Sequence, residues 1–336
     1  MGWEIRWANV LRAAIASGIM TTNPFSAPTI LPADADGVAA AAAVLERGGT
    51  VAVPTETVYG LAARADRAEA VAGIYRAKGR PDFNPLIVHV PDLAAAEKLA
   101  TFDARAHALA AAFWPGALTM VLPRRDDCGL AQAVSAGLPT VALRCPAHPV
   151  MQDVLRVSGL PLAAPSANRS GAISPTRAAH VATSLGARVD LILDGGETRQ
   201  GIESTIVGLR ADGGWALLRP GPITPEAIAQ VLGEGPEQGS AQGIEAPGQL
   251  ASHYAPGKPV RLNATDAQAD EFLIGLGAIA GDVNLSPGGD LAEAAARLYA
   301  CLHAGADAPQ PRIAVAPVPD EGIGAAINDR LRRAAA

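Results

Sequence analysis

The stretch KGRPDFNPLIVH, residues 78–89, decides how the chain is organised. It opens with the cations Lys78 and Arg80, continues through two prolines, and runs into the apolar letters LIVH. Because proline fixes φ and blocks helix continuation, the stretch predicts a rigid loop that joins a helix over 66–77 to a strand over 86–90. An arginine fork beside a lysine point charge is the usual pair for a polyphosphate. When such a pair stands alone, a solvated basic turn is the ordinary alternative.

Helical and strand patterns alternate on both sides of this loop, and the alternation predicts an α/β fold. Helices are expected over 36–47, 66–77, 92–100, 103–114, 148–158 and 175–185. Strands are expected over 50–53, 86–90, 118–122, 140–143, 160–163, 191–193 and 205–209. Two helix starts, at Ser174 and at Thr224, place a hydroxyl N-cap directly before a proline at the first helical position.

A second unit follows a linker over 233–257, which is rich in Gly, Pro, Gln and Ser and too long for a simple turn. Beyond the linker, residues 258–336 predict a smaller three-layer α/β domain. Its strands are expected over 260–262, 282–285 and 312–315, and its helices over 267–274, 290–303 and 323–333.

Composition limits the possible functions. The 336-residue chain is 49% hydrophobic and 18% charged, so it can bury full cores and is not expected to be disordered. Its net charge of -6 argues against strong direct binding to nucleic acid, which requires basic surface. Three cysteines without CxxC spacing favour a reducing cytoplasm over a disulfide framework or a structural zinc. No apolar run reaches the length that a membrane span requires.

A second polar motif, APSANRSGAISPT over 164–176, adds hydroxyl and amide groups to the two cations. It contains Ser166, Asn168 and Ser174, and Ser174 stands at an expected helix start, where backbone N–H groups and the helix dipole favour an anion. In isolation the motif is typical of a serine-rich surface loop. The chain has neither a Walker A sequence nor a GxGxxG after a strand, so a nucleotide would bind in another way. Both motifs together predict a nucleotide site that works by positioning and charge stabilisation.

Three further motifs place polar side chains next to strands. PTETVYGL carries Thr57 at a strand exit, TVALR carries Thr140 and Arg144, and GIESTIV carries Glu203 and Ser204. An arginine among apolar residues requires an anionic partner, because burying it unpaired is unfavourable. Each motif is a weak signal alone, and a strand-end histidine such as His89 is more often a hydrogen-bonded packing residue.

The order of these motifs, together with WPGALT, RPGPIT and PGQLASHYAP, resembles the long, two-domain form of the YrdC-like threonylcarbamoyl-AMP synthases. The similarity runs from about Thr29 to Arg333, so residues 1–28 are expected to be a disordered leader, with Met20 a candidate start. The resemblance implies a YrdC-type twisted mixed sheet with helices over 29–232. It also implies a nucleotidyltransferase that converts L-threonine, bicarbonate and ATP into L-threonylcarbamoyl-AMP and pyrophosphate, for threonylcarbamoyladenosine modification of tRNA.

The resemblance also implies roles for individual residues. The catalytic group that holds ATP and stabilises charge at the reacting phosphate is expected to be Lys78, Arg80, Ser166 and Asn168. Further ATP contacts are expected at Asn84, Thr140, Ser174 and Arg219. The threonine pocket is expected at Thr57, His89, Arg144, the backbone of Ala164, and Ser204, with Arg144 facing the amino-acid carboxylate. In the linker, His253 and Tyr254 are expected to belong to a lid that excludes water from the product.

Mg²⁺ is expected with ATP, although the sequence shows no all-protein cage for it. The product is expected to pass to a tRNA threonylcarbamoyl transferase complex. Two alternatives stay open. A carbamoyltransferase of hydrogenase maturation, which forms a carbamoyl-adenylate, also carries a YrdC domain, but this chain lacks its cysteine-paired zinc motifs and its acylphosphatase domain. A non-catalytic, RNA-binding YrdC module would require a basic face, which the acidic balance disfavours.

Overall fold

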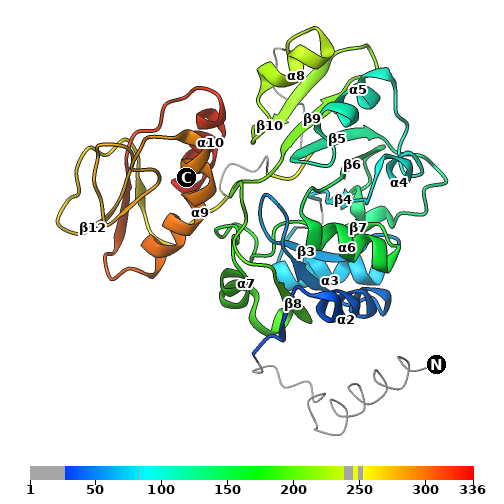
Figure 1. Ribbon diagram of the computed structural model, residues 1–336, viewed down its shortest axis with the longest axis horizontal. Coiled ribbons are helices and arrows are strands. Elements are labelled where there is room, and N and C mark those ends of the chain that lie inside the picture. The colour runs from blue at the N-terminus through cyan, green and yellow to red at the C-terminus, as the bar shows by residue number, and fades with distance from the viewer. Residues whose placement is uncertain (1–26, 82, 238–244, 249–252) are drawn as a thin grey trace, which may run out of the picture.

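The computed structural model describes residues 27–81, 83–237, 245–248 and 253–336, which form a large domain and a smaller C-terminal domain (Figure 1). The smaller domain, drawn in orange and red, lies beside one flank of the larger one. The predicted leader, apart from residues 27 and 28, lies outside the described residues, as do the linker segments 238–244 and 249–252.

The large domain is built on a ten-stranded mixed sheet. Its strands are β1 (Ile30–Pro32), β2 (Val51–Val53), β3 (Gly60–Arg64), β4 (Ile87–His89), β5 (Leu118–Pro123), β6 (Thr140–Arg144), β7 (Leu162–Ala163), β8 (Leu191–Asp194), β9 (Thr205–Leu209) and β10 (Trp215–Arg219). They follow the order β1-β8-β2-β3-β7-β4-β6-β5-β9-β10. β4 runs parallel to β6, whereas β7 is antiparallel to both β3 and β4. The predicted mixed α/β sheet is therefore confirmed.

The helices of this domain are α2 (Ala35–Glu46), α3 (Ala68–Lys78), α4 (Leu93–Glu97), α5 (Ala104–Phe113), α6 (Pro149–Ser158), α7 (Ala178–Leu185) and α8 (Pro225–Leu232). Their ends follow from local chemistry. Asp34, Asp103 and Thr224 each accept a backbone N–H of the first turn at the start of α2, α5 and α8. Glycine in the left-handed conformation ends others, as Gly159 does after α6.

The predicted helix start at Ser174 is wrong. Helix α7 begins at Ala178, and its N-cap residue is Arg177, which makes no capping hydrogen bond within the described chain. Ser174 instead turns its hydroxyl toward the carboxylate of Glu203, 29 residues further on. A tertiary partner has therefore displaced the local capping role that the Ser-Pro pair predicts. The sequence pattern also misses β1, β3 and β10; in β3 the letters GLAAR carry no β-branched or aromatic residue.

The smaller domain contains a four-stranded parallel sheet of order β11-β14-β12-β13. Its elements are β11 (Val260–Arg261), β12 (Glu271–Gly275), β13 (Val283–Asn284), β14 (Arg312–Val315), α9 (Leu291–Asp307) and α10 (Ile323–Ala334). The helix predicted over 267–274 is wrong, because this segment supplies the central strand β12. All five residues of β12 are buried, and a short apolar run does not distinguish a buried strand from a helix.

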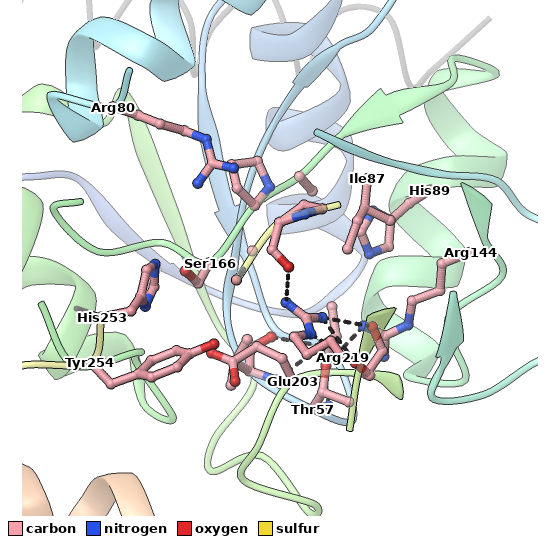
Figure 2. Close-up of a pocket in the computed structure, with 18 residues that line it drawn as sticks. Thr57, Arg80, Ile87, His89, Arg144, Ser166, Glu203, Arg219, His253 and Tyr254 are labelled. Carbon is pink, nitrogen blue, oxygen red and sulfur yellow. Dashed lines mark hydrogen bonds between the residues drawn. The ribbon is translucent and has the colours of Figure 1, made fainter. Parts of the chain in front are cut away.

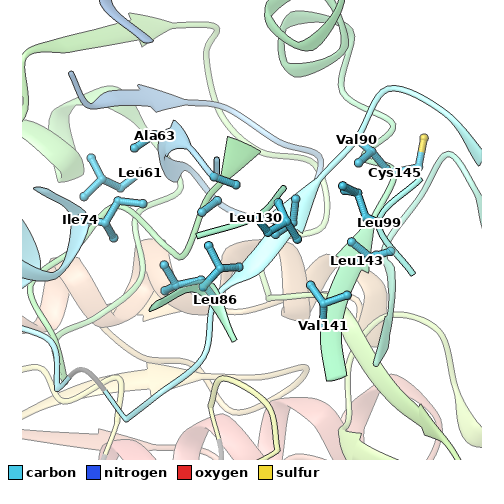
Figure 3. Packing of buried hydrophobic residues seen from close by; sticks show 14 of the residues in the cluster. Leu61, Ala63, Ile74, Leu86, Val90, Leu99, Leu130, Val141, Leu143 and Cys145 are labelled. Atoms are coloured by element: carbon cyan, nitrogen blue, oxygen red, sulfur yellow. The ribbon is translucent and has the colours of Figure 1, made fainter. Parts of the chain in front are cut away.

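The core of the large domain forms between the sheet and its helices (Figure 3). Leu61 and Ala63 of β3 pack there with Ile74 of α3, and Val141 and Leu143 extend the cluster along β6. Successive residues along β3 are buried on both sides of the sheet, so this segment shows no alternation of polar and apolar residues.

A separate apolar cluster joins the two domains. Val58, Ile173 and Ile202 of the large domain pack in one cluster with Leu298 and Leu302 of α9. Figure 1 places α9 and α10 on the side of the small sheet that faces the large domain. The C-terminal domain is thus docked through its helices by buried side chains. No helix in the described part of the chain has the length and apolar character needed to cross a membrane.

Candidate active site

A pocket with about 540 Å³ of space opens where several strands of the large sheet end (Figure 2). Its lining comes from strand ends, from the loops that follow them, and from the linker. These residues are Thr55, Thr57, Val58, Gly60, Arg80, Ile87, His89, Arg144, Ala164, Pro165, Ser166, Glu203, Ser204, Arg219, Pro247, Gly248, His253 and Tyr254.

The sheet topology brings these distant residues together. His89 ends β4 and Arg144 ends the parallel neighbour β6, and the two residues are direct partners in register. Ala164 follows β7, and its backbone N–H donates to the Ile87 carbonyl at 3.0 Å. His89 and Arg144 meet because the carboxyl ends of parallel strands lie at one edge of a sheet. Ala164 arrives from the opposite direction, because β7 runs antiparallel to β4.

Arg144 is almost fully buried, and its guanidinium is bound from three sides. It donates to Glu56 Oε1 at 2.6 Å, to Thr57 Oγ1 at 2.9 Å and to the Gly116 carbonyl at 3.2 Å. The predicted anionic partner therefore exists within the chain, and it is Glu56, which the sequence analysis missed. Burial raises the pKa of Glu56, but the charge and hydrogen bond of Arg144 outweigh burial and leave it lowered. The only signal was a carboxylate between two threonines at a strand exit.

His89 also faces the pocket, and it is only 2% exposed. Its Nδ1 is buried with no hydrogen-bond partner among the described residues, although the imidazole also interacts with the Ile87 backbone. Burial, and after it the positive charge of Arg144, lowers the pKa of His89 to about 3. The imidazole is therefore neutral at pH 7 and has one nitrogen available to a ligand.

Arg219 and Ser204 also line the pocket, where they contact each other. Arg219 donates to the Ser204 carbonyl through Nε at 3.1 Å and through Nη2 at 2.9 Å, and Nη2 also reaches Ser204 Oγ at 3.1 Å. Ser204 Oγ lies 2.8 Å from Thr119 Oγ1. Thr119 belongs to β5, so the serine hydroxyl is held between the sheet and the guanidinium.

The four residues expected to form the catalytic group fall into two pairs. Arg80 and Ser166 line the pocket, and Arg80 donates to the Pro85 carbonyl at 3.0 Å. Burial lowers the pKa of Arg80 to about 10, which still leaves the guanidinium charged at pH 7. Lys78 and Asn168 lie behind this wall and do not line the pocket that the described residues enclose.

The sequence predicts that Lys78 stands on a solvent-lined loop, but in the structure it is buried. It is the last residue of α3 and only 3% exposed, and its Nζ donates to the Ser166 and Asn168 carbonyls at 2.6 Å each. Burial, and after it the charge of Arg80, lowers the pKa of Lys78 well below its ordinary value. The Asn168 side chain donates to the Arg169 and Ala172 carbonyls. Both side chains therefore brace the loop that carries Ser166.

Three residues expected to contact ATP lie away from the pocket lining. Asn84 is buried, and its carbonyl accepts from Tyr75 and Arg80. Thr140 starts β6, at the end of the strand opposite Arg144. Ser174 is buried against Glu203.

The linker residues His253 and Tyr254 line the pocket, and their rings lie 4.2 Å apart between centroids. Burial lowers the pKa of His253 to about 3 and raises that of Tyr254. Neither side chain is therefore charged at pH 7. In Figure 2 both face the same space as Arg80 and Ser166.

The described residues contain no group of three or more His, Cys, Asp or Glu side chains that could hold a metal ion. Glu203, which lines the pocket, and Glu56, which contacts the lining residue Arg144, are each paired with a buried arginine. These residues do not form a protein cage for Mg²⁺.

Comparison with known proteins identifies the family of this chain. Residues 43–221 match the family model described as "Telomere recombination", and residues 223–336 match the one described as "Threonylcarbamoyl-AMP synthase, C-terminal domain". The chain belongs to the threonylcarbamoyl-AMP synthase family. The resemblance inferred from the sequence motifs is therefore confirmed.

Members of this family match along nearly the whole chain. The threonylcarbamoyl-AMP synthase of Bacillus subtilis (strain 168) is 42% identical, over 89% of this chain and 92% of its own length. That of Pyrococcus abyssi is 38% identical, over 88% of this chain and 92% of its own. The crystal structure of P. abyssi Sua5 complexed with L-threonine superposes with a TM-score of 0.82 at 36% identity, covering 92% of this chain and 97% of that one. The chain is accordingly an enzyme of this family, with the family's two-part fold.

Proposed function

We propose that this enzyme makes L-threonylcarbamoyl-AMP and pyrophosphate from L-threonine, bicarbonate and ATP. The observation that carries the proposal is a single pocket in which two sets of groups meet. Arg144, Thr57 and the neutral His89 form one set of lining residues, and Arg80, Ser166 and Arg219 form the other. The first set suits an amino acid, and the second suits phosphate oxygens. The P. abyssi relative, whose structure is superposable, was crystallised with L-threonine.

The threonine side is proposed to be organised around Arg144. Its guanidinium is held in one orientation by hydrogen bonds to Glu56, Thr57 and Gly116. Its remaining N–H groups are therefore already oriented when a carboxylate arrives. Thr57, His89, the backbone of Ala164, and Ser204 complete this side. His89 Nδ1 is suited to hydrogen-bond a polar group of the amino acid, because it is buried without a partner in the described chain.

The ATP side is proposed to use Arg80, Ser166 and Arg219 directly, with Lys78 and Asn168 supporting the loop of Ser166. Asn84, Thr140 and Ser174 are proposed to act through the residues they contact rather than by lining the pocket. In this scheme the threonine amine forms a carbamate either with carbon dioxide, with loss of a proton, or with bicarbonate, with loss of water. A carbamate oxygen then attacks the α-phosphorus, and pyrophosphate leaves with the electron pair of the broken P–O bond. The arginines stabilise the charge that develops on the phosphate oxygens.

Mg²⁺ is proposed to arrive with ATP and to neutralise charge on the phosphates when bound. No step is assigned to it, because the described carboxylates at the pocket are already paired with arginines.

The domain boundaries and the lid belong to the same proposal. Residues 29–232 would form the catalytic domain, 233–257 the linker, and 258–336 the C-terminal domain. Within the linker, His253 and Tyr254 would cover the bound nucleotide and keep water from the acyl-adenylate product. The product would pass to a tRNA threonylcarbamoyl transferase complex for threonylcarbamoyladenosine synthesis in the cytoplasm. The net charge of -6 supports hand-off of a small molecule over strong direct binding to nucleic acid.

The test is pyrophosphate release by the purified chain with each substrate omitted in turn. We expect release to require ATP, L-threonine and bicarbonate together, and to match threonylcarbamoyl-AMP one to one by mass spectrometry. Release that depends on carbamoyl phosphate instead would favour the carbamoyltransferase alternative. Binding of tRNA without any turnover would favour the RNA-binding alternative.

The Arg144→Met variant tests the proposed threonine side. Loss of a charge-assisted contact of roughly 1.5–3 kcal/mol should raise the threonine requirement about tenfold to over a hundredfold, and the ATP requirement far less. Arg156→Met, an exposed arginine on α6, is the matched control and should match the unaltered chain. Equal weakening of both substrates would contradict the assignment of Arg144 to the carboxylate.

A further inference from the structure

Glu203 is a pocket carboxylate whose partners come mostly from the other domain. It lines the pocket at 6% exposure, and its Oε1 accepts the hydroxyl of Ser174. Its Oε2 accepts Tyr299 OH at 2.7 Å and Arg330 Nε at 3.1 Å. Tyr299 belongs to α9 and Arg330 to α10, so two helices of the C-terminal domain reach the rim of the pocket.

Arg330 is held in place by two carboxylates, those of Glu203 and Asp329. It is fully buried and is also paired with Asp329 at 2.8 Å, and its Nη2 reaches the Glu203 carbonyl at 3.5 Å. Burial raises the pKa of Glu203, but the charges of Arg330 and Arg219 outweigh burial and lower it to about 2. The carboxylate therefore stays ionised between one arginine from each domain. Removing either Glu203 or Arg330 from the docked molecule would leave the other charge buried without one of its partners, which is unfavourable.

The backbone next to Glu203 is held just as closely. Gly201 lies against α9 so tightly that a Cβ there would stand 2.2 Å from the Ala296 carbonyl. Gly201 also has φ of +69°, which side chains rarely adopt. Directly after Glu203 in the chain, the Ser204 carbonyl accepts two hydrogen bonds from Arg219, one from Nε and one from Nη2. The segment 201–204 is thus clamped between α9 and the pocket wall.

We infer that Tyr299 and Arg330 are positioning residues of the active site, which act through Glu203 to hold Ser204 and Arg219. The catalytic pocket is then complete only while the C-terminal domain is docked, and this domain is a working part of the enzyme. The same two residues also contact the proposed lid. Arg330 lies 5.5 Å from the centre of the Tyr254 ring, and the Tyr254 and Tyr299 rings lie 5.5 Å apart. The inference rests on the proposed function, because its test reads the proposed reaction.

The experiment compares full-length variants at a temperature where each is folded, as checked by circular dichroism. Tyr299→Phe removes a single hydroxyl and keeps the ring, so it disturbs packing least. Arg330→Lys keeps the charge, whereas Arg330→Met removes it. Arg332→Met, an exposed arginine on the same helix, is the matched control. Limited proteolysis monitors whether the domains stay docked.

We expect Tyr299→Phe and Arg330→Met to lower kcat at saturating substrates at least tenfold, because Ser204 and Arg219 lose their fixed positions. We expect Arg330→Lys to retain more activity than Arg330→Met, and Arg332→Met to match the unaltered chain. If the ion pair is purely structural, the folded and docked variants will keep an unchanged kcat and unchanged KM values for ATP and L-threonine. That result would overturn the inference. If Arg330→Met does not fold, Tyr299→Phe and Arg330→Lys decide the question. An unaltered chain without threonine-dependent pyrophosphate release would instead overturn the proposed function.

Discussion

Lys78 and Arg80 are two residues apart, yet they occupy opposite sides of the pocket wall. The difference arises because Lys78 still belongs to α3, whereas Gly79 ends that helix in the left-handed conformation and turns the chain. The ammonium then points into the loop at Ser166 and Asn168, whose carbonyls have few other ways to be satisfied when buried. Of the two basic residues, Lys78 therefore supports the loop and Arg80 faces the pocket.

At this scale we predict that Lys78→Met lowers the free energy of unfolding by about 2–4 kcal/mol, because two buried carbonyls lose their donor. Urea denaturation measures the change. Lys98→Met, an exposed lysine at the end of α4, is the control and should shift the midpoint little. If Lys78→Met has the same midpoint as the unaltered chain, the ammonium does not support the loop in this way.

At the scale of elements, α7 of the large domain meets α9 of the C-terminal domain through two histidines. The rings of His180 and His303 stack with centroids 3.9 Å apart and an angle of 25° between their planes. Burial, and after it the positive charges of His303 and Arg177, lowers the pKa of His180 to about 4. Burial also lowers the pKa of His303, against a smaller opposite effect of Asp307. Both rings are therefore neutral in the folded chain at pH 7.

This pair should make stability depend on pH. In the unfolded chain each histidine titrates near its ordinary value of 6.5, so below that pH the unfolded state binds more protons than the folded state. The contribution of the pair to the free energy of unfolding is then fully present above about pH 6.5 and is lost as the pH is lowered toward 4. We predict that the thermal midpoint drops less between pH 7 and pH 5 in His180→Phe than in the unaltered chain.

His107 provides a control of opposite sign. It lies exposed beside Glu97, whose hydrogen bond raises the pKa of His107. The stability that it contributes is present at low pH and is lost as the pH rises, so His107→Gln should not reduce the loss in acid. An equal acid-induced drop in His180→Phe and in the unaltered chain would show that the stacked pair does not titrate as described.

At the scale of the whole molecule, the large domain and the linker line one pocket, and the C-terminal domain supports this lining from behind. The apolar cluster that contains Ile202 and Leu298 docks the domains, and Tyr254 belongs to the same cluster. The linker therefore reaches the pocket supported from behind by the C-terminal domain. This arrangement explains why polar rings at the end of a Gly-rich and Pro-rich segment are buried.

We predict that replacing both His253 and Tyr254 by alanine raises the ratio of free AMP to threonylcarbamoyl-AMP about tenfold, because water gains access to the acyl-adenylate. Mass spectrometry of the products, normalised to pyrophosphate, measures the ratio. Val157→Ala, an exposed position on α6 outside the pocket lining, serves as the control. An unchanged product lifetime in the double variant would leave these residues as a connector and not a lid.

Much of the fold follows from local signals along the chain. Aspartate and threonine caps, left-handed glycines and apolar runs predict helices such as α5 and α6 and strands such as β9 close to their observed bounds. The same signals fail at β12, where burial on both faces removes the alternation that marks a strand. They fail again at Ser174, where a distant carboxylate competes with the helix for the hydroxyl.

The sequence by itself determined the α/β class, the family, and the polar motifs of the pocket, because each depends on residues close together in the chain or on the order of motifs along it. The tertiary structure alone decided which polar residues face the pocket and which support it from behind. It turned Lys78 inward, paired Arg144 with Glu56, and joined Glu203 to Tyr299 and Arg330, which lie 96 and 127 residues further on. A buried charge pairs with whichever opposite charge the packing brings near, and the spacing of residues along the chain does not predict that partner.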